Sequence, residues 1–202
     1  MAITLSPPAK APATTVIDKR GDVLLQLTKD GQPTADLLFS SQVLSLASPV
    51  FEAMFNHGFA EGQDLSSASP RSVPLPDDDP TYMTILCNIF HMRTSDVPDT
   101  LDLDSLAGLA IICDKYDCLN GVRFHSRVWV AQLLPDPEVV GFEKLLFVAY
   151  VLDLPHEFYK VTQSLIQNRK VNIKLDVVSH GHDFVPWKII GAYFNFLIVP
   201  IP

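Results

Sequence analysis

The chain has 202 residues, of which 48% are hydrophobic and 19% charged, and this composition excludes global disorder because it supplies a packed core. A formal net charge of -8, with no long run of Lys or Arg, argues against direct binding of nucleic acid. Three cysteines are too few and too oddly numbered for a secreted disulfide framework, and the first residues lack the apolar run of a signal peptide. We therefore expect an intracellular protein of the cytoplasm, the nucleus or both.

The first part of the chain predicts a flexible arm followed by a β-hairpin. Residues 1–15 contain prolines among small residues, which is typical of an arm without regular structure. The apolar run of residues 22–27 predicts a strand, residues 29–32 carry a Lys-Asp-Gly turn signal, and residues 35–39 predict the returning strand. The ordered fold is expected to begin near Val16.

Two short helices are expected after the hairpin. Residues 42–46 predict one helical turn or more, and Ser48 and Pro49 then supply the N-cap and the first position of a second helix. His57-Gly58 ends this helix, because glycine readily adopts the left-handed conformation of a helix C-terminus. The apolar face of the second helix comprises Val50, Phe51, Met54 and Phe55.

The middle of the chain predicts a short strand and two further helices. A polar, serine-rich loop precedes the strand at residues 73–75. The acidic residues 77–79 and Pro80 form a strong helix start, since carboxylates complement the positive end of the helix dipole. The buried stripe of that helix is expected to comprise Tyr82, Leu86, Ile89 and Phe90. Residues 106–116 predict the next helix.

The remainder of the chain predicts helices only. They cover residues 122–134, residues 136–152 with Asp136-Pro137 as the cap, and residues 155–170. Short connections marked by proline favour antiparallel packing of consecutive helices. The predicted fold class is α+β, with a small sheet flanked by short helices and followed by an all-helical extension.

The predicted domain organisation has four parts: an arm at 1–15, a core domain at 16–119, a helical extension at 120–170 and an apolar tail at 171–202. The tail ends in fourteen residues without a charge, IIGAYFNFLIVPIP, and a membrane span needs about 20 apolar residues. This end can be a buried final element, a partner-binding tail or a weak anchor. We expect the segment from about Ser179 onward to be an altered terminus that is foreign to the fold.

Several stretches of the predicted core match the pattern of a known family when they are taken in order. The stretches are residues 21–25, 39–44, 48–55, 58–62, 73–78, 85–91 and 110–117. Together they resemble the BTB/POZ family, in particular its fungal members; no single stretch is specific, but order and spacing make a strong joint signal. Many relatives carry His-Lys where this chain has Ser40-Ser41, although fungal members commonly carry serines there.

The resemblance implies a non-catalytic protein-interaction domain. Members of the family pair with themselves, and many dock as substrate adaptors onto a cullin ubiquitin-ligase scaffold. Cullin-binding members carry a hydrophobic residue, any residue and Glu after the helix that begins at Ser-Pro, and Phe59-Ala60-Glu61 stands at that place. An apolar anchor with a carboxylate at its rim suits such a contact, whereas the alternative is that Phe59 packs locally and Glu61 is solvated. The predicted partner-binding residues are Phe59, Glu61, Phe55 and Asp22.

Two functions therefore remain open. A substrate adaptor for a cullin ligase predicts an exposed Phe59 beside Glu61. A self-associating scaffold or transcription-linked regulator with no ligase role predicts a buried Phe59 and an apolar helical face elsewhere. In many relatives an N-terminal strand swaps between protomers, but the proline-rich arm before Val16-Ile17 argues against a long strand, so we expect self-association through helix faces.

An enzyme is the rival class. The groups that could carry chemistry are Cys113, Cys118, His125, His180 and His182. The two cysteines are five residues apart, which suits neither a CxxC redox pair nor a zinc knuckle, and the two C-terminal histidines have one carboxylate nearby, Asp183. No GxSxG elbow, Walker loop, GxGxxG turn or HExxH helix occurs. We expect no catalysis, no cofactor and no metal.

Overall fold

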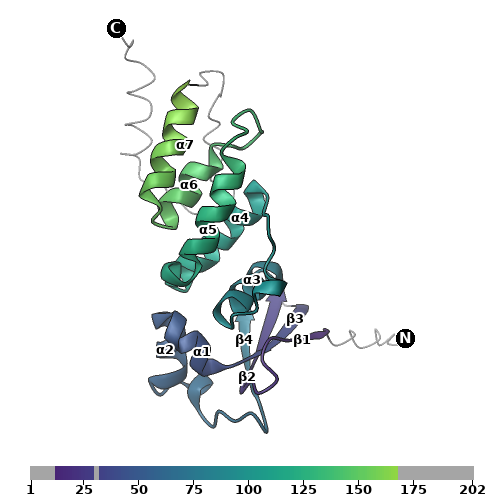
Figure 1. The fold of residues 1–202 in the computed structure, drawn as a ribbon. Coiled ribbons are helices and arrows are strands. Elements are labelled where there is room, and N and C mark those ends of the chain that lie inside the picture. Colours follow the sequence, from purple (N-terminus) through teal and green to yellow (C-terminus); the bar gives the residue numbers. More distant parts are fainter. Residues whose placement is uncertain (1–11, 30–31, 168–202) are drawn as a thin grey trace, which may run out of the picture.

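The computed structural model describes residues 12–29 and 32–167, and within them the fold is α+β, as predicted (Figure 1). The strands are β1 (Thr14–Val16), β2 (Val23–Lys29), β3 (Gln32–Phe39) and β4 (Arg71–Pro76). The helices are α1 (Ser41–Ala47), α2 (Pro49–Asn56), α3 (Pro80–Phe90), α4 (Leu103–Lys115), α5 (Leu119–Leu133), α6 (Lys144–Val151) and α7 (Pro155–Gln167). Two short 3-10 turns lie at Ala60–Gly62 and Thr94–Asp96.

The strands form one sheet in the order β1-β3-β2-β4. β2 and β3 pair antiparallel, which confirms the predicted hairpin, while β1 runs parallel to β3 and β4 runs parallel to β2. Alternate side chains of β2 (Val23, Leu25 and Leu27) are fully buried, because successive residues of a strand point to opposite faces. β1 begins at Thr14, inside the segment predicted to be an arm; it is held by pairing with residues 36–38, a long-range contact that the local composition does not encode.

The predicted break between α1 and α2 is confirmed at Ser48. The Ser48 hydroxyl accepts a hydrogen bond from the Phe51 N–H at 3.1 Å, and Pro49 occupies the first helical position. Gly58, at φ +82°, follows the end of α2 in the left-handed conformation that was expected there. Phe51 and Phe55, on the predicted apolar face, are buried, but Val50 lies on the exposed side of the helix.

α3 begins as predicted, with the Asp79 carboxylate accepting from the N–H groups of Thr81 and Tyr82. Its buried surface is broader than the predicted stripe. Leu86 and Ile89 are buried, Tyr82 and Phe90 are half-buried, and Met83, Ile85, Cys87 and Asn88 are buried as well. The reason is that α3 contacts β3 and α1 as well as α4 and α5, so it is covered on more than one side.

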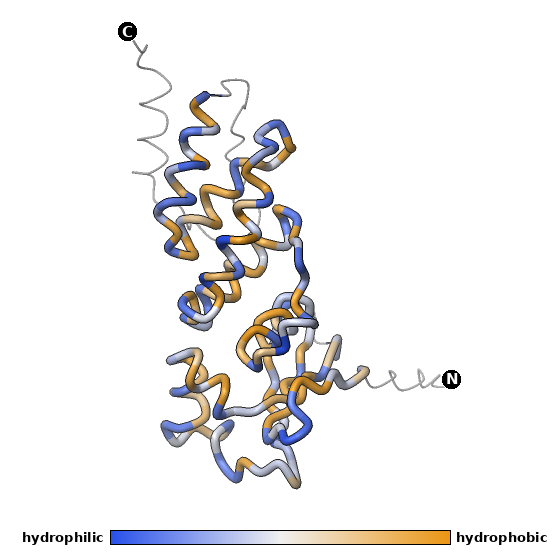
Figure 2. The backbone as a smooth tube through the Cα atoms, viewed as in Figure 1, coloured by the Kyte–Doolittle hydropathy of each residue, from blue (hydrophilic) through white to orange (hydrophobic). Residues whose placement is uncertain are grey.

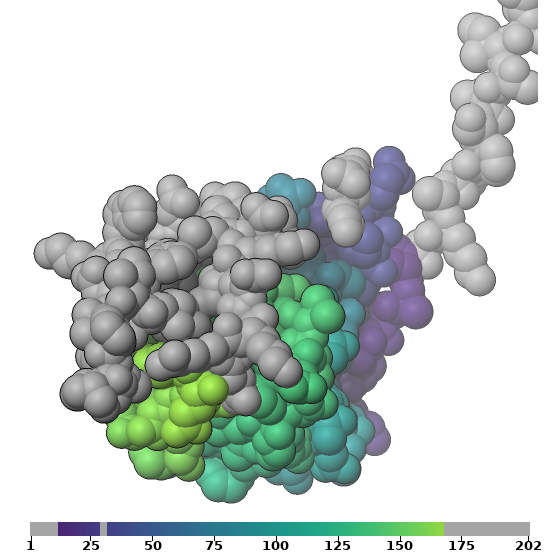
Figure 3. Space-filling view, turned by 90° about the horizontal axis from the view of Figure 1, so that it is seen from above, coloured from purple at the N-terminus to yellow at the C-terminus, as the bar shows by residue number. Residues whose placement is uncertain are grey.

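After α4 the described part of the chain forms α5, α6 and α7, which Figure 3 shows grouped on one side of the molecule, away from the purple N-terminal strands. The helix predicted from residue 136 begins only at Lys144. Residues 135–143 form turns instead, in which Gly141 takes φ +89° and interrupts helical geometry. Two ion pairs, Arg123–Asp153 and Arg127–Glu157, fasten α5 to the start of α7.

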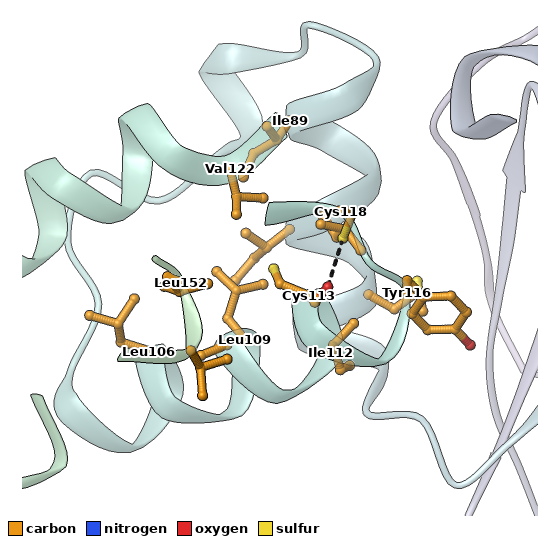
Figure 4. Packing of buried hydrophobic residues seen from close by; sticks show 14 of the residues in the cluster. Ile89, Leu106, Leu109, Ile112, Cys113, Tyr116, Cys118, Val122 and Leu152 are labelled. Carbon is orange, nitrogen blue, oxygen red and sulfur yellow. Dashed lines mark hydrogen bonds between the residues drawn. The ribbon is translucent and has the colours of Figure 1, made fainter. Parts of the chain in front are cut away.

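Buried side chains form one cluster that runs from the sheet through α3 and α4 to the C-terminal helices. Figure 2 shows hydrophobic positions along the backbone of all these elements. The cluster includes Leu25 of β2, Val122 of α5 and Leu165 of α7. Figure 4 shows Val122 and Leu152 beside the buried side chains of α4. The predicted boundary at residue 119 therefore lies at the start of α5, and the core is continuous across it.

A buried carboxylate joins three parts of this core. Asp78, just before α3, has a side chain that is 3% exposed and accepts from the Lys115 ammonium at 2.7 Å and from the Tyr116 hydroxyl at 2.6 Å. The Tyr116 ring stacks on Phe51 of α2 with centroids 4.4 Å apart, and its carbonyl accepts from the Ser48 hydroxyl. Burial and the bond to Asp78 raise the pKa of Tyr116, so the phenol remains a donor.

Replacing Tyr116 with Phe should lower the free energy of unfolding by about 1.5–3 kcal/mol, because a hydrogen bond to a buried charge is lost while the ring stacking is kept. Urea unfolding measures the change. The matched control is Tyr159→Phe on α7, whose exposed hydroxyl accepts from Gln163; it should change stability by less than about 0.5 kcal/mol. Equal effects of the two substitutions would contradict the role given to Asp78.

A neutral histidine connects the end of α3 with the start of α1. His91 Nδ1 donates to the Cys87 carbonyl at 2.8 Å and Nε2 accepts from the Ser40 N–H at 3.2 Å, which assigns the proton to Nδ1. Burial lowers the pKa of His91 from its ordinary value of 6.5. Protonation would also turn the acceptor Nε2 into a donor and leave the Ser40 N–H without this partner.

The free energy of unfolding of the wild type should depend on pH because of His91. Because its pKa is lower in the folded chain, the unfolded chain binds more protons below about pH 6.5 and the stabilisation is lost as the pH falls. His91→Leu should be less stable than the wild type by about 1–3 kcal/mol near pH 7.5, and the gap should narrow below about pH 6.5. Urea unfolding at several pH values tests this, and a gap independent of pH would contradict it.

Candidate protein-interaction surface

The loop after α2 presents the predicted anchor. Gly58 turns the chain away from the helix, Phe59 is extended, and residues 60–62 form a single 3-10 turn. The Gly62 N–H donates to the Phe59 carbonyl at 3.2 Å, and the amide side chain of Gln63 donates to the same carbonyl at 3.4 Å. The loop is therefore short and internally hydrogen-bonded.

Phe59 and Glu61 lie at the surface of this loop. The Phe59 side chain is 57% exposed, and Glu61 is half-buried. Among the described residues no ion pair involves Glu61, so its carboxylate is not tied to a cation of that part of the chain. The arrangement offers an apolar ring with an acidic group two residues further on, which is the exposure that the adaptor hypothesis predicts.

Phe55 does not share this surface. Its side chain is 3% exposed, stacks on Phe51 with centroids 5.9 Å apart and lies 6.2 Å from the Phe39 ring. The prediction that Phe55 contacts a partner is corrected on this point, because its helical spacing from Phe51 directs it into the core. Its backbone supports the loop instead: a Cβ at Gly62 would stand 2.2 Å from the Phe55 carbonyl oxygen.

Asp22, the fourth predicted contact residue, is used inside the chain. Its carboxylate accepts from the Ser41 N–H at 2.8 Å and from the Ser41 hydroxyl at 2.7 Å. The Ser40 side chain makes no capping hydrogen bond. The Asp22 carboxylate, just before β2, accepts from the free Ser41 N–H at the start of α1 instead. These hydrogen bonds explain the acidic residue before β2 without a contact to a partner protein.

The groups considered for catalysis are packed as core residues where the structure describes them. Cys87, Cys113 and Cys118 are buried, and the Cys118 thiol donates to the Cys113 carbonyl at 3.4 Å (Figure 4). Burial raises the pKa of Cys87 to about 12, and a hydrogen bond with the Cys118 thiol, together with burial, raises that of Cys113. Protonated, shielded thiols are poor nucleophiles and metal ligands.

The histidines considered as ligands give no metal site in the described part of the chain. His125 packs beside the rings of Phe124 and Trp129. His180 and His182 lie outside the described residues. Within residues 12–29 and 32–167, no cluster of three or more His, Cys, Asp or Glu side chains could hold a metal ion.

Sequence reasoning missed a groove between the start of α2 and the start of α5. It has a volume of about 350 Å³ and is lined by residues 45–49 and Glu52 on one side and by Asp117 and Asn120 on the other. We call it the α2–α5 groove. The groove lies where the α1–α2 junction meets the α4–α5 junction. The local feature of the sequence that points to it is Leu46, an apolar residue that remains exposed on α1.

Gly62→Ala should move the loop that carries Phe59, because the added methyl group collides with the Phe55 backbone. We expect a loss of roughly 1–3 kcal/mol in the free energy of unfolding. Gly58→Ala meets no atom within 4 Å and should cost only the left-handed backbone strain, about 1 kcal/mol. Urea unfolding compares the two, and a Gly62→Ala variant as stable as the wild type would contradict the close approach.

Comparisons with known proteins do not assign the chain to a family. A scan against models of protein families finds no match to the chain. A search of curated proteins likewise finds none that matches. Among the described helices, none combines the length and the apolar character that crossing a membrane requires.

Proposed function

We propose that the chain is a non-catalytic protein-interaction domain of the BTB/POZ type that acts as a substrate adaptor for a cullin-type ubiquitin ligase. The observation that carries the proposal is the exposure of Phe59 on a loop that its own hydrogen bonds and Gly62 hold in place. The aromatic residue one helical turn earlier, Phe55, is buried, so the exposure of Phe59 is specific to the loop.

The chemistry of the loop suits docking onto an apolar pocket. A largely exposed phenylalanine that becomes buried at an interface is the kind of residue that supplies most of the binding energy. The loop is held before binding, so little conformational entropy is lost on association. Glu61, two residues after Phe59, adds orientation and faster association with a basic partner surface more than it adds affinity.

The sequence resemblance supports the same proposal. The matching stretches fall on β2, on the α1–α2 pair and the Phe59 loop after it, on β4, on the second half of α3, and on the end of α4. The helices α5–α7 follow that core directly and share its buried cluster, so they can widen a contact made by the core.

A self-associating scaffold is the second candidate, and the exposed face of α5 favours it. Phe124 is 74% exposed and Val128 lies four residues further on the same face, also exposed. The scaffold hypothesis also predicts a buried Phe59, however, and the exposure of Phe59 therefore favours the adaptor.

The test is binding of the purified chain to the N-terminal domain of a cullin scaffold, by pull-down and then by surface-immobilised kinetics. Phe59→Ala should weaken binding by about 30-fold or more, the effect of a 2 kcal/mol hot spot. Glu61→Ala should weaken it on the order of fivefold, mainly through the association rate. Val140→Ala, an exposed apolar residue in the α5–α6 turn, is the matched control and should bind like the wild type.

Light scattering on the same samples separates the two candidates. The adaptor proposal fails if the folded wild type shows no binding to the cullin domain. If that protein is also a stable dimer and Phe124→Ala makes it monomeric, the scaffold function replaces the adaptor.

A further inference from the structure

The α2–α5 groove is a surface that the Phe59 loop does not use. In Figure 1 the lower end of α5 lies next to α1 and α2, and the groove occupies this junction. α2 has eight residues, and a helix rises 1.5 Å per residue, so the end of α2 that leads to the Phe59 loop lies roughly 12 Å from Pro49, the first residue of α2, which lines the groove. The two surfaces can therefore be altered independently.

One exposed apolar side chain lines the groove, and two more lie further along α5. Leu46, which lines it, is 87% exposed. Asn120 lines the other wall, and Phe124 is one helical turn further along the same face of α5, with Val128 one turn beyond it. Apolar side chains that gather around a depression, with polar groups between them, mark a contact surface for another molecule.

The groove carries negative charge. Glu52 and Asp117 line it, and a smaller hollow of about 200 Å³ continues it from Asp117 toward Arg123 and Asp153. Arg123 pairs with Asp153 at 2.8 Å, so its charge is compensated and the groove stays acidic overall. The whole chain has a formal net charge of -8, which disfavours a second copy as the occupant and favours a basic partner.

We propose that the α2–α5 groove binds an amphipathic helix of a partner protein that carries leucine-like residues on one face and Lys or Arg beside them. The apolar residues of that helix pack between Leu46 and Phe124, and its cations pair with Glu52 and Asp117. This is the helix-in-groove mode of peptide recognition, in which apolar anchors repeat at helical spacing. The inference does not depend on docking of Phe59 to a cullin.

The test uses fluorescence anisotropy with a labelled amphipathic peptide of leucine and lysine, and with a second peptide in which glutamate replaces lysine. The full chain should bind the lysine peptide saturably and more weakly as salt increases, and it should not bind the glutamate peptide. Phe124→Ala, and the double variant Glu52→Gln with Asp117→Asn, should each weaken binding at least tenfold. Asn suits position 117 because the backbone there has φ +46°, a conformation that Asn tolerates.

Two control variants distinguish an effect of the groove carboxylates from an effect of net charge. Asp77→Asn removes a charge at another left-handed position, and Glu138→Gln removes one from the α5–α6 turn; both should bind like the wild type. The proposal is overturned if the lysine peptide does not bind, or if all the charge variants weaken it equally, which would indicate a response to net charge alone. It is also overturned if sedimentation shows a dimer that Phe124→Ala dissociates, because the groove would then be a contact between two copies.

Discussion

The arrangement of the helices depends on the hydrogen bonds that the buried Asp78 carboxylate accepts from Lys115 and Tyr116. An ion in the protein interior costs several kcal/mol unless partners compensate it. Lys115 and Tyr116 are those partners, and both stand at the end of α4, so compensating the charge fixes α4 against the start of α3. Tyr116 extends the constraint to α2, because its ring stacks on Phe51 and its carbonyl accepts from Ser48.

That constraint also shapes the two candidate surfaces. Asp117 follows Tyr116 in a left-handed conformation that turns α4 into α5, and this turn is one wall of the α2–α5 groove. The first residues of α2, held by Ser48, form the other wall. At the opposite end of α2, the contact of Gly62 with the Phe55 carbonyl holds the Phe59 loop. Contacts at the two ends of α2 therefore hold the backbone of both candidate surfaces in place.

Features of the fold that depend on neighbouring residues are predictable from the sequence. Ser48-Pro49 and Asp79-Pro80 start helices through hydrogen bonds to residues no more than three positions away, and the hairpin is marked by its own turn. Features that depend on distant contacts are not. β1 exists because residues 36–38 lie beside it, and the extra burial of α3 comes from neighbours on several sides.

In the candidate site, too, the features set by neighbouring residues are predictable and those set by distant contacts are not. Phe55 and Phe59 are similar residues four positions apart, yet helical spacing applies only to Phe55, because α2 ends at Asn56 and Gly58 turns the chain before Phe59 is reached. A correct reading of that helix end is thus enough to predict which ring is exposed. The use of Asp22 could not be predicted in this way, since its partner Ser41 lies 19 residues away. Asp22 therefore binds within its own chain, and Phe59 is the exposed ring of the predicted set because the helix ends before it.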